Sequence, residues 1–283
     1  AYIIKGDKKE TKLERRDHAI FLFEESIKLR SELNQSSSSP KFLYEFGKLW
    51  KLYGDALYEK QFMASAQSGG EAIVALSKGI AILEQVVREN PDIDKYRLEK
   101  SSTYETRGYY YYYQKKDDLA IADFTKAIEI NPENSSAYRR RGNSYRSQKK
   151  YDLATADYKK AIEIKPDFSG AYNSRGISFH DQKKYDEAIA DYSKAIEINP
   201  EYDLAYRNRG ISYRYLLKYD LAIADYTKAI EINPENEFGY NSRGYSYYLT
   251  KNYDLAIADY TKAIEINPKK ANYLMSRGVC YRR

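Results

Sequence analysis

The side chains that most often catalyse reactions or bind metals are scarce in this sequence. Among its 283 residues are two histidines, His18 and His180, and one cysteine, Cys280. Asp181 follows His180 directly, and adjacent residues on a helix do not face each other, so this pair would not act together. One cysteine excludes an internal disulfide and a zinc site built from cysteines. Since there is also no glycine-rich phosphate loop, HExxH pair or GxSxG elbow, we expect neither an enzyme nor a bound metal or cofactor.

Arginine and aspartate, in contrast, recur at a fixed spacing. Six arginines are 34 residues apart, namely Arg107, Arg141, Arg175, Arg209, Arg243 and Arg277. An aspartate follows each of the first five after 16 residues, namely Asp123, Asp157, Asp191, Asp225 and Asp259. The aligned arginines could form a track for an anion, or each could pair with its aspartate inside the fold. We favour internal ion pairs, because a guanidinium near the core needs a partner.

Tyrosine is the most unusual feature of the composition, with 32 residues. The run from Tyr109 to Tyr113 could form a platform for base stacking, because aromatic residues beside cations bind single-stranded nucleic acid. However, the formal net charge is only +6, and lysine and arginine are spread among aspartate and glutamate. We therefore favour a protein-binding surface, where tyrosine is common, over a nucleic-acid site.

Glycine and proline show that these spacings belong to a repeat of 34 residues. Six glycines share one position of the repeat: Gly108, Gly142, Gly176, Gly210, Gly244 and Gly278. Five prolines share another: Pro132, Pro166, Pro200, Pro234 and Pro268. We number the glycine as position 8 and the proline as position 32. This numbering gives repeats 101–134, 135–168, 169–202, 203–236 and 237–270, followed by a partial repeat, 271–283.

Apolar and aromatic residues predict two helices in each repeat. Aromatic residues at positions 4 and 11 flank the glycine at position 8, which is the spacing of one helix face. Alanines at positions 20 and 27 and an aromatic residue at position 24 form a second such face. A glycine inside a helix costs about 0.5 to 1 kcal/mol relative to alanine, so its return in every repeat indicates that the two helices are in close contact there.

This order of aromatic, glycine, aromatic, alanine, aromatic and proline resembles the tetratricopeptide repeat, and the stretch YDLAIADYTKAIEINP resembles second helices of its bacterial members. The resemblance covers residues 101–283. It departs from the family at position 7, where leucine is usual and this sequence has arginine. The resemblance implies an all-α, right-handed α-solenoid of antiparallel helix pairs, the TPR superhelix. It also implies a scaffold or adaptor that binds a protein or peptide in its concave groove.

In this family, positions 2, 5, 9, 12 and 13 of the first helices line the concave groove. Carried over to this sequence, they predict a peptide-binding groove formed by Tyr109, Tyr112, Tyr113, Arg139, Asn143, Arg146, Asn173, Ile177, His180, Arg207, Ile211, Arg214, Tyr215, Asn241, Tyr245 and Tyr248. Glu105 and Asp181 are the acidic residues at such positions. Arginine and asparagine donate hydrogen bonds to carboxylates and carbonyls, so we expect an extended peptide of acidic character. The family's carboxylate clamp is matched only by Arg139 and Asn143.

The first hundred residues depart from the regular pattern, and we interpret 1–100 as degenerate or irregular TPR-like helices. Trp50, Tyr53, Gly54 and Leu57 resemble a first helix, and residues 17–34 resemble the second helix of an earlier repeat. A polar linker, 36–40, separates them. Residues 94–100 are expected to lengthen the first helix of repeat 101–134.

Two other functions remain open at this stage, a repeat that binds single-stranded nucleic acid and a self-assembling structural spacer. The partial repeat at the C-terminus could support self-association, because an incomplete repeat leaves apolar surface uncovered. The sequence has no apolar run long enough to span a bilayer and no signal-peptide pattern, so we expect a cytoplasmic protein. The chain begins and ends within a repeat, and we expect it to be part of a longer protein.

Overall fold

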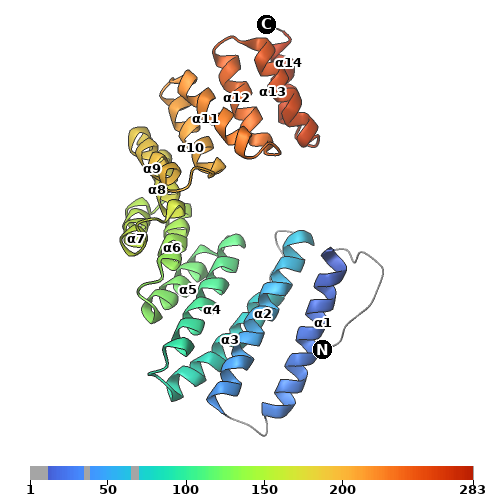
Figure 1. The fold of residues 1–283 in the computed structure, drawn as a ribbon, viewed down its shortest axis with the longest axis vertical. Helices are drawn as coiled ribbons and strands as arrows, with labels where there is room; N and C mark the ends of the chain where they lie inside the picture. The colour runs from blue at the N-terminus through green and yellow to red at the C-terminus, as the bar shows by residue number, and fades with distance from the viewer. Residues whose placement is uncertain (1–11, 35–38, 65–69, 283) are drawn as a thin grey trace. The chain divides into compact units, whose positions relative to one another are not determined.

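The computed structural model describes residues 12–34, 39–64 and 70–282, and in these ranges the chain forms helices and no strand (Figure 1). The 14 helices are α1 (Lys12–Asn34), α2 (Pro40–Ala64), α3 (Gly70–Glu89), α4 (Asp94–Tyr113), α5 (Asp117–Ile130), α6 (Ser135–Ser147), α7 (Tyr151–Ile164), α8 (Ser169–Asp181), α9 (Tyr185–Ile198), α10 (Asp203–Tyr215), α11 (Tyr219–Ile232), α12 (Glu237–Leu249), α13 (Tyr253–Ile266) and α14 (Ala271–Cys280). The two helices predicted for each repeat are confirmed. We call the even-numbered helices from α4 to α14 the first helices and the odd-numbered helices from α5 to α13 the second helices.

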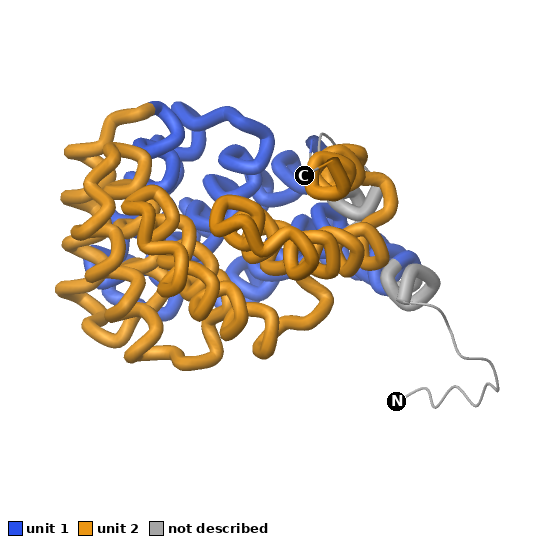
Figure 2. Tube along the Cα trace, turned by 90° about the horizontal axis from the view of Figure 1, so that it is seen from above, with its two compact units in different colours: residues 1–148 blue, residues 149–283 orange. Residues whose placement is uncertain are grey.

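The chain divides into two compact units, residues 1–148 and 149–283 (Figure 2). Within the first unit, each helix from α1 to α6 packs on the next helix in the chain, and the same holds from α7 to α14 in the second unit. Stacking of each helix mainly on its sequence neighbours is the arrangement of a helical solenoid. The predicted all-α solenoid of helix pairs is therefore confirmed.

The N-terminal helices follow the sequence pattern in part. Residues 17–34 lie in α1, and α4 begins at Asp94, so the predicted lengthening of the first helix of repeat 101–134 is confirmed. A Cβ atom added at Gly54 of α2 would lie 2.9 Å from Cγ of Leu76 in α3, which is the kind of contact expected for a first-helix glycine. Positions 36–38 of the predicted linker lie outside the described residues. The interpretation of 1–100 as degenerate repeats stays a prediction.

The repeated glycine lets the aromatic ring at position 24 press against the first helix. A Cβ atom added at Gly176 would lie 2.7 Å from Cε1 of Tyr192, and one added at Gly210 would lie 2.8 Å from Cε1 of Tyr226. These distances are shorter than packed carbon atoms allow, so alanine would force the helices apart. The predicted close contact is therefore confirmed in these two repeats. The expected contact of Gly142 with Ala154 joins residues of different units and stays a prediction.

The aromatic residues at position 11 are less buried than we expected. Tyr145 and Tyr111 are half-buried rather than part of the core. The neighbouring Tyr110 is buried instead, and its hydroxyl donates a hydrogen bond of 2.5 Å to Asp55 of α2. The physical reason is that the position-11 rings cover the arginine at position 7, as Tyr213 does with a ring centroid 5.9 Å from Cζ of Arg209.

Bidentate ion pairs join the first helix of a repeat to its second helix. They link Arg107 to Asp123, Arg175 to Asp191, Arg209 to Asp225 and Arg243 to Asp259, with nitrogen-to-oxygen distances of 2.7 to 2.8 Å. The internal ion pairs predicted for the last three arginines are confirmed. The expected pair of Arg141 with Asp157 joins the two units and stays a prediction. The carboxylates raise the pKa of Arg175, Arg209 and Arg243 above its usual value, against the effect of burial.

A hydroxyl group at position 25 extends each ion pair to the preceding repeat. Nη1 of Arg209 donates a hydrogen bond of 2.9 Å to Ser193, and Nη1 of Arg243 donates one of 3.0 Å to Thr227. The Ser193 hydroxyl donates in turn to the carbonyl of Ile189, at 2.8 Å. For Arg175 the equivalent position holds Lys159, whose ammonium group cannot accept a hydrogen bond. The guanidinium thus connects three helices in most repeats.

The turn between the two helices of each repeat contains one residue in the left-handed conformation. This residue is at position 15, and φ lies between 60° and 63° at Lys115, Lys149, Lys183, Leu217 and Lys251. A residue with a Cβ atom pays about 1 to 2 kcal/mol for this conformation, whereas glycine adopts it freely. The turn therefore stores a small strain in every complete repeat.

We expect Arg175→Leu to lower the free energy of unfolding by about 3 kcal/mol, because it leaves the Asp191 carboxylate, with an 8% exposed side chain, without its partner. The double variant Arg175→Leu with Asp191→Leu should recover most of this loss, since no unpaired charge remains. Urea unfolding followed by circular dichroism measures both. An unchanged free energy in the single variant would mean that the pair acts only as a surface feature.

We expect Leu217→Gly to raise the free energy of unfolding by about 0.5 to 1 kcal/mol, because it removes the left-handed strain and Leu217 is 70% exposed. The neighbouring Leu216 has φ of −85°. Leu216→Gly should therefore destabilise the protein, and it serves as the control in the same urea titration. Destabilisation by both variants would show that the turn is not strained.

Candidate binding face of the first helices

The first helices form a continuous face within each unit. In the first unit α4 contacts α6, and in the second unit α8, α10, α12 and α14 each contact the next first helix. No such contact joins one second helix to the next among the described helices α7 to α13. The first helices therefore lie closer together than the second helices, as expected on the inner side of a curved stack.

All of the predicted groove residues lie on first helices. Tyr109, Tyr112 and Tyr113 lie on α4; Arg139, Asn143 and Arg146 on α6; Asn173, Ile177 and His180 on α8; Arg207, Ile211, Arg214 and Tyr215 on α10; and Asn241, Tyr245 and Tyr248 on α12. Their side chains are half-buried or exposed, with one exception. Asn173 is buried and accepts a hydrogen bond of 3.0 Å from Asn208 of α10. Its inclusion among the groove residues was wrong, because this amide joins two neighbouring first helices.

In the first unit, the structure brings five of the predicted residues together around one pocket of about 180 Å³. Its lining consists of Tyr109, Tyr112, Tyr113, Arg139 and Asn143, together with Phe124 and Arg140, which the sequence analysis missed. The Tyr109 hydroxyl donates a hydrogen bond of 3.0 Å to that of Tyr113. These contacts hold the rings of α4 in a fixed arrangement beside α6.

Arg140 reaches this pocket from position 6, which we did not assign to the groove. Its guanidinium carbon lies 4.0 Å from the ring centroid of Tyr109, and its Nε lies 3.0 Å from Glu105. Ser136 also donates a hydrogen bond of 2.6 Å to Glu105. Glu105 therefore acts inside the fold, where it orients Arg140 over an aromatic ring, and its charge is largely neutralised.

In the second unit, His180 lies in an aromatic cluster. Its ring centroid is 5.2 Å from that of Tyr185 and 5.1 Å from that of Tyr215, and these two tyrosines stack at 5.2 Å. Nδ1 lies 2.9 Å from Oγ of Ser212, and the tautomer decides which group donates. Burial lowers the pKa of His180, Arg214 lowers it further, and Asp181 opposes both. His180 therefore joins α8 to α10 as well as contributing a ring to the face.

Arg207 and Arg214 lie on α10 beside aromatic rings. The guanidinium carbon of Arg207 is 5.5 Å from the ring centroid of Phe238, and that of Arg214 is 5.1 Å from the ring centroid of Tyr245. Both rings belong to α12, so the arginines bridge two neighbouring first helices through cation–π contacts. Phe238 was not among the predicted groove residues, because position 2 of that repeat was left out as apolar.

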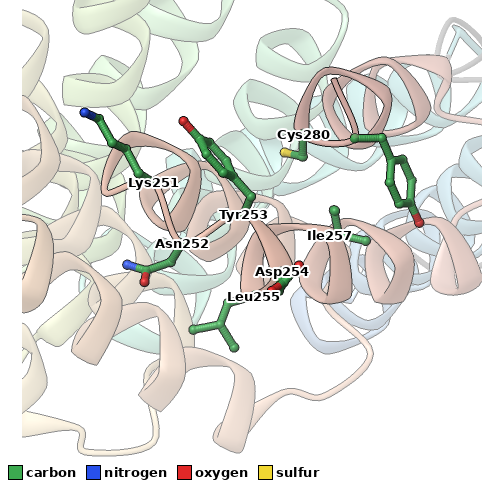
Figure 3. A pocket seen from close by; sticks show the side chains of 8 residues that line it. Lys251, Asn252, Tyr253, Asp254, Leu255, Ile257 and Cys280 are labelled. Atoms are coloured by element: carbon green, nitrogen blue, oxygen red, sulfur yellow. The ribbon is translucent and has the colours of Figure 1, made fainter. Parts of the chain in front are cut away.

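A larger pocket, of about 500 Å³, lies at the start of α13 beside α14 and outside the predicted groove (Figure 3). Residues 251–255, Ile257, Cys280 and Tyr281 line it. Pockets of about 360 and 380 Å³ occupy the same turn in repeats 101–134 and 203–236. These pockets are therefore a regular product of the turn and not a specific site. Burial raises the pKa of the Cys280 thiol, which makes it a poor nucleophile.

A family model for the tetratricopeptide repeat matches residues 101–134, 135–168, 169–202, 204–236 and 238–270. These segments make up more than half of the 283 residues. The chain belongs to the tetratricopeptide repeat family. Comparison with curated proteins gives no match.

Solved structures show the same tetratricopeptide repeat fold. PilF of Pseudomonas aeruginosa superposes with a TM-score of 0.59 at 21% identity, over 64% of this chain and 82% of that one. A MamA structure gives 0.51 at 28% identity, over 59% and 97%. YrrB, described as a TPR protein with an unusual peptide-binding site, gives 0.52 at 19% identity, over 69% and 97%. At such identities the likeness to PilF and YrrB establishes the fold alone.

Two searches of the described residues bear on other kinds of site. No group of three or more histidine, cysteine, aspartate or glutamate side chains is arranged to hold a metal ion in the described ranges. None of the helices in these ranges combines the length and the apolar character that crossing a bilayer requires. The first-helix face is therefore the feature of this tetratricopeptide repeat array that we analyse further.

We expect His180 to make stability depend on pH. Its pKa in the folded protein lies below the usual value of 6.5. Above 6.5 the ring is neutral in both states, and as the pH falls below 6.5 the unfolded chain takes up the proton first, so stability falls until the pH passes the folded pKa. The variant His180→Tyr should remove this part of the loss between about pH 7.5 and 5.5, as measured by urea unfolding at each pH. An equal loss in both proteins would contradict it.

Proposed function

We propose that this protein is a scaffold or adaptor that binds an extended peptide segment of another protein along the face of the first helices. The observation that carries the proposal is a set of exposed tyrosines on this face. Tyr113 is 41%, Tyr215 is 51% and Tyr245 is 41% exposed. Large aromatic side chains that stay accessible on an ordered surface mark sites of protein recognition, because each one buries a large area at a small cost in entropy.

The polar residues of the face suit the backbone of an extended peptide. Arg139 and Asn143 of α6 and Asn241 of α12 present donors that can bond to peptide carbonyls and carboxylates. The description of YrrB as a protein with a peptide-binding site adds support from a similar fold. Regular helix pairs also give a rigid surface, so binding would order the ligand and not the protein.

Binding of single-stranded nucleic acid is the less supported alternative. It would require a row of free cations, and the arginines at position 7 are neutralised wherever the described pairs form, as for Arg175, Arg209 and Arg243. Self-association has one observation in its favour, the exposed apolar residues of α14 and the turn after it. Leu274 is 45%, Met275 is 72% and Tyr281 is 68% exposed. A mass that rises with concentration in sedimentation would support it.

To test the proposal, peptides are selected from a random display library on the purified protein, and their affinity is measured by fluorescence anisotropy. The double variant Ile177→Ala with Tyr245→Ala removes contact area from α8 and α12. We expect it to weaken binding at least about tenfold, because central aromatic contacts dominate such interfaces. Circular dichroism should show unchanged helix content.

The matched control is Leu221→Ala with Leu255→Ala, which removes side chains that are 49% and 50% exposed on the second helices. This control should bind the selected peptides as well as the original protein does. If the control loses binding and the Ile177 and Tyr245 variant does not, the peptide binds to the second helices and the proposal fails.

A further inference from the structure

We infer that α10, α11 and α12 form a subsite for an oxyanion, with Arg207, Arg214 and the hydroxyl of Tyr226 as its ligands. The inference rests on the proposed function in one respect, since it assigns the oxyanion to the acidic group of a bound peptide. The family's usual carboxylate clamp uses other positions, and it is matched in this chain only by Arg139 and Asn143. The argument therefore depends on the contacts in this part of the structure.

The first observation is that Arg207 and Arg214 carry uncompensated charge. Arg209 on the same helix has a bidentate partner in Asp225. Within the described residues, neither Arg207 nor Arg214 forms an ion pair, although both are half-buried. Nε of Arg207 is buried and has no hydrogen-bond partner there. Half-buried guanidinium groups without a counter-charge are costly unless an anion binds to them.

The second observation is a buried hydroxyl between these arginines. Tyr226 of α11 is fully buried, and its ring passes against Gly210, which lies between positions 207 and 214 on α10. Its hydroxyl is buried without a hydrogen-bond partner within bonding distance. Burial raises the pKa of Tyr226 to about 12, while the charges of Arg214 and Arg207 lower it. Both arginines are therefore close to a phenol that stays protonated and can donate a hydrogen bond.

Together these groups offer donors and no acceptor. Positions 207 and 214 are two helical turns apart, about 10 Å along the axis, so their long side chains can approach one anion from opposite directions. Arginine binds planar carboxylates and phosphates through two parallel hydrogen bonds. The rings of Phe238 and Tyr245 lie next to the guanidinium groups and limit their access to water.

The neighbouring repeats show that this arrangement is not a general property of the array. The equivalent positions hold Asn173 and His180 in repeat 169–202, and Asn241 and Tyr248 in repeat 237–270. The aromatic residue at position 24 is a tyrosine in all three repeats, and only repeat 203–236 surrounds it with two arginines. Tyr260, the counterpart of Tyr226 in repeat 237–270, is equally buried. It accordingly provides a matched control.

The test uses the full chain labelled with ¹³C at Cζ of tyrosine and titrated with small probes, namely inorganic phosphate, phosphoserine, and N-acetylglutamate amide. The Tyr226 signal, assigned through Tyr226→Phe, should shift and saturate, whereas that of Tyr260 should not move. The tighter of the phosphate and carboxylate probes identifies the source of the oxyanion. Shifts that fail to saturate, or that are equal at Tyr226 and Tyr260, would overturn the subsite.

Two charge variants complete the test. Arg207→Gln with Arg214→Gln should weaken probe binding at least about tenfold. Lys228→Gln with Lys262→Gln removes the same charge from exposed positions on second helices and should leave probe binding unchanged. Equal losses in both variants would show that only net charge attracts the probes. Because the probes need no peptide, failure of the Ile177 and Tyr245 experiment leaves this result independent.

Discussion

The rest of the structure depends on how the arginine at position 7 is neutralised. A guanidinium group placed between two helices must meet a carboxylate, and the aspartate at position 23 supplies it in a bidentate geometry for Arg175, Arg209 and Arg243. The hydroxyl at position 25 and the tyrosines at positions 4 and 11 then complete its surroundings. One charged residue in place of the family's leucine thus explains four other recurring residue types, and it couples each helix pair to the preceding one.

This neutralisation also decides which charges the first-helix face can offer to a partner. Since the arginines at position 7 serve the fold, the accessible positive charge comes from other positions, such as Arg207 and Arg214 on α10. The same division applies to acidic and amide groups, because Glu105 and Asn173 also form contacts within the protein. The face therefore combines exposed tyrosines with a small number of arginines, a composition suited to recognising protein segments.

The sequence predicted the features that a period can reveal. The helix pairs, the glycine contacts and the partners of Arg175, Arg209 and Arg243 all follow from spacing, because each is repeated and local. Features set by a neighbouring helix were missed. Tyr110 is buried because α2 lies beside it, and Arg140 reaches the pocket because Glu105 holds it. The position-15 lysines gave no signal, since lysine does not usually adopt a left-handed conformation.

The lysine at position 159 has a consequence for how the array unfolds. Where a hydroxyl receives the third donor of the arginine, adjacent repeats share a polar contact in addition to their apolar surface, and the contact between α7 and α8 lacks it at Arg175. In a linear array, cooperativity depends on the free energy of each junction between neighbours. A weaker junction there divides the chain into two blocks that melt separately, so that native-state hydrogen exchange would report a partly folded species in which residues 169–282 keep their structure.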